Sequence, residues 1–378
     1  MPKTLKEILK NKMNSNIEQF YQDYSKNIIT NNTLYNLIKK ECKLEKETDK
    51  NLQNFLNLKE KKNINDKQNK ISIIIPTYNR KIQLKECLDS ILNQTYTNFE
   101  IIIIDDCSHE NIEKYLQKTY QDPRIKYIRN PENKGAGYSR KMGYQESTGK
   151  YIIFCDDDDY YIDSNFFENS IKIFKENDVS MICSNTYTKY EDKNVYKFNK
   201  LNINSYMDTL DYLEKFQFYY EKPNSTFSTI FKKSILEKSK FQSMLMVNDS
   251  SIYMRALLVK SKIYVIEEII GIYRIHSNNM SFHIEADFLI ENLKEKKYIY
   301  EQIVNNKLLD NPQKWFLSEI LLTVKYYLDG ENNKKEDINK IMMWLKQNAI
   351  KYNRIIIEIN LYKVKKYIKN IIKNIIKK

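Results

Sequence analysis

Residues 151–161, YIIFCDDDDYY, decide the fold of this chain. The apolar first part, 151–154, predicts a buried strand, and four consecutive carboxylates, Asp156 to Asp159, follow it. Neighbouring like charges raise one another's pKa, so four such acids resist ionisation unless a cation compensates them. Oxygen ligands of this kind suit a hard divalent ion such as Mg²⁺ or Mn²⁺.

The acidic run also has a plainer interpretation as a solvated turn. Its place at the carboxyl end of a buried strand argues against that, because open α/β sheets bind their ligands there. Successive side chains of an extended chain point to opposite faces, so we expect Asp156 and Asp158 to share one face. Asp159 is left out of the expected primary ligands.

Strands and helices alternate on both sides of this stretch, from residue 71 onward. Further buried strands are expected at 71–75, stopped by Pro76, and at 99–104, 125–128 and 179–183. Helices are expected at 81–92, 112–116, 138–146 and 166–175. This order predicts an α/β fold, an α/β/α sandwich around a mostly parallel sheet with right-handed crossovers.

The remaining segments give the domain organisation. Residues 1–58 are predicted to be a helical extension, with helical spacing at 5–13, 34–45 and 52–60, that packs on the rest of the chain or binds a partner. The polar stretch 59–70 predicts a linker. Within a catalytic domain at 71–283 we expect helices at 207–218 and 250–259, and strands at 225–231 and 263–275, the latter interrupted by Glu267 and Glu268. A helical region at 284–350, broken at Pro312 and Gly330, precedes a basic amphipathic tail at 351–378.

Composition narrows the class of protein. The chain has 378 residues, and its five cysteines form no CxxC pair, which favours free thiols in a reducing compartment. The amino-terminal residues are polar and predict no signal peptide, and no apolar run is long enough to span a bilayer. We therefore expect a cytoplasmic protein.

The net charge of +13 is concentrated near the carboxyl end, where residues 351–378 hold nine Lys or Arg and one Glu. No nucleic-acid-binding motif accompanies this charge, so nucleic acid is not an expected partner. The tail places Leu361, Val364 and Ile368 on one face and lysines on the other, a pattern typical of helices at a membrane surface. Packing of that apolar face on the protein body explains the pattern equally well.

Six motifs in order resemble the inverting glycosyltransferases of family 2, which have the GT-A fold. They span residues 72–281 and are SIIIPTYNR (72–80), IIIIDDCS (101–108), NKGAGYSRKMG (133–143), GKYIIFCDDDDYYID (149–163), NDSSIYMR (248–255) and YRIHSNNMS (273–281). One such motif is weak, but six in the family's order make a specific match. The resemblance covers roughly 210 of the 378 residues.

The resemblance implies a role for individual residues. Asp249 would be the general base, and Asp158, Asp156 and His276 would hold Mn²⁺ or Mg²⁺. The nucleotide-sugar would be bound by residues from the first four motifs. These are Pro76 and Tyr78 at the base pocket, Asp106 on the nucleobase, Arg140 on the nucleotide, and also Arg80, Lys134, Asp156 and Asp157.

Three of these residues also have a purely structural interpretation. Asp249 could be the N-cap of the helix expected at 250–259, His276 a surface or core histidine, and Asp106 a cap on the segment that follows it. The sequence also departs from the family at Asn248, where Glu is usual. Further departures are Lys141 in place of Asn, and Tyr161 and Asp163 in place of Trp and Pro.

The implied reaction is metal-dependent transfer of a sugar, with inversion, from a nucleotide-sugar, most often UDP-linked. A hydroxyl of a surface glycan, such as capsule or lipo-oligosaccharide, would be the acceptor, and a lipid-linked acceptor would suit a tail at the inner membrane face. One alternative is a nucleotidyltransferase, which should have a Gly-rich phosphate loop after the first strand, where this chain has PTYNRKIQ. The other is a non-catalytic glycan-binding scaffold. Donor sugar, linkage and oligomeric state are not predicted.

Overall fold

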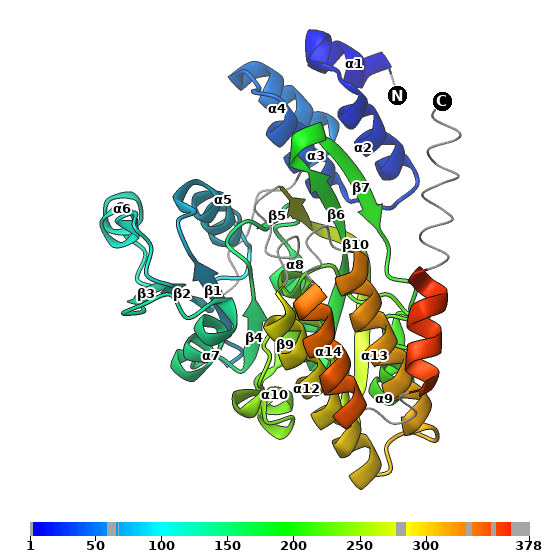
Figure 1. Cartoon of the computed structure of the whole chain (residues 1–378). Helices are drawn as coiled ribbons and strands as arrows, with labels where there is room; N and C mark the ends of the chain where they lie inside the picture. Colours follow the sequence, from blue (N-terminus) through cyan, green and yellow to red (C-terminus); the bar gives the residue numbers. More distant parts are fainter. Residues whose placement is uncertain are drawn as a thin grey trace.

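The computed structural model describes residues 3–58, 66, 68–276, 285–329, 335–348 and 353–363. Most of the linker predicted at 59–70 and the tail from residue 364 therefore lie outside the described residues. Figure 1 shows a central sheet with the amino-terminal helices above it and the carboxyl-terminal helices below. No helix in the described ranges is long and apolar enough to cross a bilayer.

The described strands form one sheet in the order β3-β2-β1-β4-β9-β6-β10-β5. Its parallel part is β3 (Ile125–Arg129), β2 (Phe99–Asp105), β1 (Ile71–Thr77) and β4 (Tyr151–Phe154). The antiparallel strand β9 (Thr229–Lys232) joins β4 to β6 (Met181–Tyr190), which runs parallel to β10 (Lys262–Ile275). Short antiparallel strands β5 (Tyr160–Tyr161) and β8 (Tyr206–Asp208) pair with β10, and β7 (Val195–Asn199) pairs with β6. The predicted fold class is confirmed.

Strand β1 does not stop at Pro76, as the sequence predicted, but continues to Thr77 beside Asp105 of β2. The hydrogen bond of the Ile74 carbonyl with the Cys155 N–H shows that this side of β1 faces β4. Two residues further on, Pro76 faces the same side, where β4 has already ended. The missing N–H of Pro76 therefore removes no bond from the ladder.

Helices cover both faces of the parallel part. They are α5 (Lys81–Leu92), α6 (Ile112–Thr119), α7 (Ala136–Glu146) and α8 (Phe166–Glu176), close to the predicted ranges. Alternate residues of β1 enter different cores: Ile73 and Ile75 pack with α5 and α8, whereas Ile74 packs on the opposite face. Helix α7 lies so close to β1 that a Cβ at Gly143 would be 2.3 Å from Ile74.

The second half of the sheet differs in detail from the prediction. The helix expected at 207–218 is the shorter α9 (Thr209–Glu214), because β8 occupies its first residues. The strand expected at 225–231 begins with a 3-10 turn, η3 (Thr226–Ser228), and the helix expected at 250–259 is α11 (Asp249–Leu257). The predicted interruption of β10 at Glu267 and Glu268 is confirmed as a register shift between Ile266 and Ile269.

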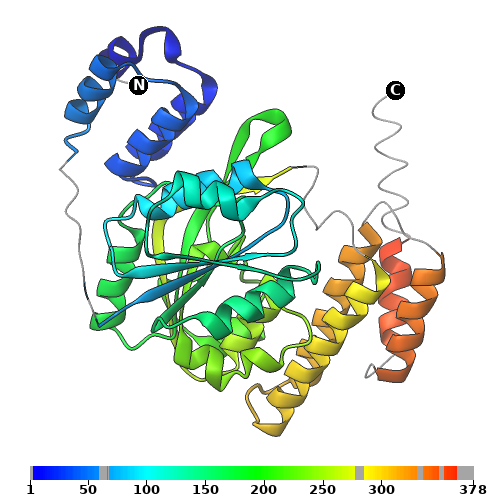
Figure 2. The same cartoon turned by 90° about the vertical axis from the view of Figure 1, so that its left-hand side faces the viewer.

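Four helices at the amino-terminal end pack on the β5, β6, β7 and β10 end of the sheet (Figure 2). They are α1 (Lys3–Leu9), α2 (Ser15–Ser25), α3 (Asn31–Glu41) and α4 (Lys46–Phe55), with a 3-10 turn η1 (Lys10–Lys12) after α1. Helix α2 lies outside the segments predicted from spacing. Phe20 of α2 packs against Tyr187 and Tyr196, so this extension shares a core with the sheet.

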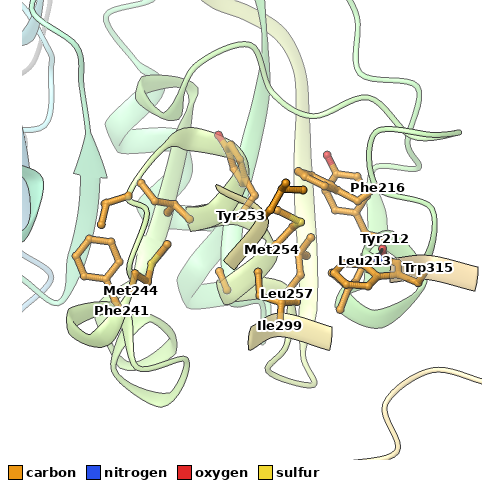
Figure 3. Packing of buried hydrophobic residues seen from close by; sticks show 14 of the residues in the cluster. Tyr212, Leu213, Phe216, Phe241, Met244, Tyr253, Met254, Leu257, Ile299 and Trp315 are labelled. Atoms are coloured by element: carbon orange, nitrogen blue, oxygen red, sulfur yellow. Dashed lines mark hydrogen bonds between the residues drawn. The ribbon is translucent and has the colours of Figure 1, made fainter. Parts of the chain in front are cut away.

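Helices α12 (Ala286–Asn305), α13 (Pro312–Asp329) and α14 (Lys335–Asn348) lie on the opposite side of the molecule (Figures 1 and 2). The predicted break before Pro312 is confirmed, and Gly330 lies outside the described residues. Residues 353–363 are also helical, with Ile355 and Ile359 buried in the same core and Leu361 exposed. Figure 3 shows Tyr253, Met254 and Leu257 of α11 in this core, near Ile299 of α12.

Helix α10 (Lys233–Lys238) follows β9, and the 3-10 turn η4 (Phe241–Ser243) leads from it toward α11. A further 3-10 turn, η2 (Glu191–Lys193), joins β6 to β7. Phe241 stacks on Phe154 of β4 with ring centroids 5.1 Å apart. The segment before α11 is thus held against the strand that precedes the acidic run.

Candidate active site

Three neighbouring parallel strands end at one edge of the sheet. β1 ends at Thr77, β2 at Asp105 and β4 at Phe154, and the carboxyl ends of parallel strands share an edge. The antiparallel β9 lies between β4 and β6, so β6 and β10 point the same way as β4. His276, directly after β10, therefore comes to the same edge as the acidic run.

The acidic run is a turn and not the extended segment that we expected. The Asp159 N–H donates to the Asp156 carbonyl at 3.2 Å, and Asp157 and Asp158 lie in the turn. Asp156 and Asp158 consequently have different partners: Arg140 binds Asp156, whereas Arg80 and His276 bind Asp158. The turn has a structural reason, because the chain must reverse from β4 to pair β5 antiparallel with β10.

Arg80, at the start of α5, binds two of the four carboxylates. Its Nη1 lies 3.1 Å from Asp157 Oδ1 and 2.7 Å from Asp158 Oδ2. The Thr77 hydroxyl donates to the other oxygen of Asp157 at 2.7 Å. Burial, together with the neighbouring Asp158 charge, raises the pKa of Asp157 to about 7 in spite of these donors. Arg80 and Asp157 thus stabilise the turn from inside.

Asp158 and His276 form the pair that the motifs predicted. His276 Nε2 lies 3.0 Å from Asp158 Oδ2, although 118 residues separate them in the chain. Burial alone would raise the pKa of Asp158, but the hydrogen bond with His276 and the Arg80 charge lower it overall. Asp158 is therefore an ionised carboxylate beside an imidazole.

Arg140 of α7 connects the acidic turn to the predicted base. Its Nη2 lies 2.6 Å from Asp156 Oδ1 and 3.5 Å from Asp249 Oδ1, and its Nη1 donates to the Val247 carbonyl at 2.9 Å. Burial raises the pKa of Asp156, and Arg140 opposes this only in part. Arg140 is itself 6% exposed, so its present contacts are within the protein.

Asp249 is not the N-cap of α11, because Asn248 caps that helix by accepting the Ser251 N–H at 2.9 Å. The departure from the family at Asn248 thus has a structural role. Asp249 is the first helical residue, with its side chain 21% exposed. Its carboxylate is free of the capping role and remains available for chemistry.

Two site residues were missed by sequence reasoning. Lys222 Nζ lies 4.0 Å from Asp249 Oδ2 and donates to the carbonyls of Pro223 and Asn224 at 3.0 and 3.1 Å. Arg274 donates through Nε to the Asp158 carbonyl, and its backbone N–H donates to Asp159 at 3.3 Å. No motif surrounds Lys222, whereas Arg274 lies in the quoted YRIH segment and could have been found there.

The residues expected at the nucleobase line a neighbouring part of the same edge. Tyr78 is 40% exposed, and Pro76 is buried in β1. Both oxygens of Asp106 accept backbone N–H groups, from Lys134 at 2.9 Å and Gly135 at 2.7 Å. Asp106 therefore shapes the loop before α7 and does not cap the segment that directly follows it, where Asp105 accepts the Ser108 N–H; the Lys134 side chain pairs with Glu132.

The predicted metal ligands fit a divalent ion only in part. When two ligand atoms lie about 2.1 Å from an ion and at right angles to each other, they are about 3 Å apart. His276 Nε2 and Asp158 Oδ2 have this separation. Asp156 is held by Arg140, and within the described ranges no three His, Cys, Asp or Glu side chains form a group able to hold a metal. An ion at Asp158 and His276 would need further oxygens, such as those of a diphosphate.

The five cysteines are free, as predicted. The Sγ atoms of Cys87 and Cys155 lie 3.6 Å apart in the core behind the acidic turn. Burial raises the pKa of Cys155 well above its ordinary value, so this thiol is protonated. These thiols pack against the turn without entering the candidate site.

Comparison with known proteins adds to the observations on sequence and fold. The sequence profile described as "Glycosyl transferase family 2" matches residues 72–245. The glycosyltransferase GlyG of Streptococcus pneumoniae is 30% identical over 226 residues, covering 56% of this chain and 72% of GlyG. The GalNAc(5)-diNAcBac-PP-undecaprenol beta-1,3-glucosyltransferase of Campylobacter jejuni is 29% identical over 209 residues, covering 54% of this chain and 65% of that enzyme.

The fold also matches that of a solved structure, S. aureus TarS in complex with UDP-GlcNAc. The TM-score is 0.57 at 17% identity, and the match covers 73% of this chain and 79% of TarS 1-349. In several other curated relatives the matched part spans only between 18% and 35% of the relative's length.

Proposed function

Because this chain belongs to glycosyltransferase family 2, we propose that it transfers a sugar from a nucleotide-sugar, with UDP as the nucleotide, to a hydroxyl of a surface glycan. The observation that carries the proposal is the placement of Asp249 beside the acidic turn, through the shared partner Arg140. A base and a diphosphate site must be close together for a hydroxyl to attack as the diphosphate leaves.

In the proposed reaction Asp249 removes the proton of the acceptor hydroxyl as its oxygen attacks the anomeric carbon. The bond from that carbon to the nucleoside diphosphate breaks in the same displacement, which inverts the anomeric centre. A divalent cation held by Asp158 and His276 would offset the negative charge on the departing diphosphate. Arg80 and Thr77 hold the turn that presents Asp158.

The donor and acceptor classes rest on the related proteins. TarS, which shares the fold, was solved with UDP-GlcNAc, and the name of the C. jejuni enzyme specifies an undecaprenol-linked glycan. We propose a lipid-linked glycan as acceptor here. Hydrolysis of a panel of UDP-, GDP- and dTDP-sugars in the presence of Mn²⁺ identifies the donor, and turnover of GDP- or dTDP-sugars alone contradicts the choice of UDP.

Asp249→Asn tests the assignment of the base. This change keeps the size of the side chain and removes its basicity, so we expect transfer to fall by about 10²- to 10⁴-fold while UDP binding persists. Asp211→Asn, an exposed carboxylate of α9, is the matched control and should leave the rate unchanged. Full activity of Asp249→Asn would reject this residue as the base.

Peripheral contact with the inner membrane surface through residues 361–378 is a separate part of the proposal. It rests on the lysine-rich amphipathic sequence and on the exposed side chain of Leu361. Residues from 364 lie outside the described ranges. Deleting 361–378 and fractionating cells tests it. Membrane association that is unchanged by the deletion would remove this part and leave the transferase proposal standing.

A further inference from the structure

The amino-terminal helices reach the candidate active site, although they lie outside the family match at 72–245. Lys40, near the end of α3, places its Nζ 2.5 Å from Glu86 Oε1 of α5. Asn36, one turn earlier, donates to the Ile162 carbonyl just after β5. Helix α3 is thus bound to α5, which begins beside the acidic turn at Arg80, and to the residue that follows β5.

The ion pair continues inward from Glu86. Its second oxygen, Oε2, accepts a hydrogen bond from Arg274 Nη1, and Arg274 Nε donates to the Asp158 carbonyl. Lys40, Glu86 and Arg274 therefore form a continuous chain from an amino-terminal helix to the backbone of the proposed metal ligand. Exposure falls along it, since the side chains of Lys40 and Glu86 are 34% exposed and that of Arg274 is 8% exposed.

An aromatic ring joins the two ends of this chain. Lys40 Nζ lies over the Tyr160 ring, 4.4 Å from its centroid, and the Arg274 guanidinium lies 5.0 Å from it. Tyr160 directly follows Asp159 and pairs with Ile272 of β10. Because cations attract the face of an aromatic ring, Lys40 and Arg274 hold Tyr160, and with it the end of the turn.

An isolated exposed ion pair contributes little to the stability of a fold. Lys40 differs because its two partners contact the acidic turn. Glu86 binds Arg274, which donates to the Asp158 carbonyl and to the Asp159 side chain, and Tyr160 directly follows Asp159. Its removal should therefore disturb the position of the turn more than the stability of the fold.

We propose that Lys40 is a positioning residue for the diphosphate- and metal-binding turn, acting through Glu86, Arg274 and Tyr160. The inference rests on the proposed function and makes the amino-terminal helices part of the catalytic unit. It follows that the domain matched by the family would bind its nucleotide and ion poorly without them.

The test compares Lys40→Ala, Lys40→Arg and Lys39→Ala in the full chain. Arginine can keep both the pairing with Glu86 and the contact with Tyr160. Lys39, the adjacent residue, is the matched control because its Nζ lies 3.9 Å from Asp49 and contacts Tyr35, both within the extension. Binding of Mn²⁺ in the presence of UDP is measured by titration calorimetry, together with the thermal unfolding midpoint.

We expect Lys40→Ala to weaken Mn²⁺ binding about tenfold with little change in the unfolding midpoint. Lys40→Arg and Lys39→Ala should bind Mn²⁺ with an affinity within twofold of that of the wild-type protein. Wild-type affinity in Lys40→Ala would overturn the positioning role and leave the proposed function intact. An equal loss in Lys39→Ala would also overturn it, because the effect would then be a general one of the helix. If the wild-type protein binds neither UDP nor Mn²⁺, the proposed function itself is overturned.

Discussion

Each oxygen of the Asp249 carboxylate lies near a different cation. Arg140 is 3.5 Å from Oδ1 and Lys222 is 4.0 Å from Oδ2. Arg140 is buried, and the Lys222 ammonium is held by two backbone carbonyls, so neither cation is a loose surface charge. The two cations therefore hold the Asp249 carboxylate in place beside the acidic turn, where the proposed reaction requires it.

Lys222→Ala should therefore slow transfer without abolishing it. Loss of one neighbouring cation leaves Arg140 in place, and we expect kcat to fall about tenfold, equivalent to about 1.4 kcal/mol. The KM for the donor should change less, because Lys222 lies at Asp249 and not at Asp158. Initial rates over a range of donor concentrations separate the two constants.

Lys260→Ala, the removal of an exposed lysine after α11, is the control for this change and should leave both constants unaltered. If Lys222→Ala changes the donor KM and leaves kcat as it was, then Lys222 contacts the donor and does not support the base.

At the level of elements, strand β10 brings His276 to the acidic turn. The strand pairs with β6 on one side and with β5 and β8 on the other, and it ends one residue before His276. At Gly271 the neighbouring chain comes very close, so that a Cβ would lie 2.3 Å from Phe227 Cε2 and 2.8 Å from the Tyr160 carbonyl. The pairing of β5 with β10 therefore depends on glycine at this position.

Gly271→Ala should force β5 away from β10 and separate Asp158 from His276. Overpacking of this kind costs about 1–3 kcal/mol of unfolding free energy, and we expect weaker Mn²⁺ binding in addition. Urea unfolding and calorimetry measure the two effects. The matched change is Gly137→Ala in α7, where the nearest atom to the new Cβ would be 3.5 Å away and the stability should not fall. Equal stability of the two variants would contradict this account of Gly271.

At the level of the whole molecule, the carboxyl-terminal helices hold the helix that carries Asp249. Arg255 of α11 donates through Nε to Glu295 of α12, and both side chains are buried. The second oxygen of Glu295 accepts the Leu245 N–H at 2.9 Å. Glu295 thus binds the chain on both sides of Asp249, and the shared core with Ile299 adds apolar contact (Figure 3).

Glu295→Ala would leave the Arg255 guanidinium buried without its carboxylate. Breaking a buried pair from one side costs about 3–5 kcal/mol, and we expect a loss of this size in urea unfolding. Glu291→Ala, one turn earlier and exposed, should change the free energy of unfolding by less than about 0.5 kcal/mol. A loss below 1 kcal/mol for Glu295→Ala would mean that the core alone holds α11 on α12.

Much of the fold was predictable from local pattern. The strands at 71–75, 99–104, 125–128 and 151–154 are apolar runs, and the structure has β1 to β4 there with small changes at their ends. Helix α2 lies in the extension predicted to be helical, although no segment was assigned to it, and the helix expected at 207–218 was too long because β8 occupies its first residues. The acidic run was correctly placed at a strand end, and the turn of its plainer interpretation is present, but this turn is buried and not solvated.

The sequence by itself determined which residues are candidates for the chemistry: Arg140, the carboxylates at 156–159, Asp249 and His276 are present in the order of the family. Tertiary structure alone decided how they are paired, with Asp156 on Arg140, Asp157 on Thr77 and Arg80, and Asp158 on His276. The physical reason is distance along the chain, since local preference acts over a few residues whereas Asp158 and His276 are 118 apart. The same holds for Lys222 and Lys40, which local pattern gave no reason to place at the site.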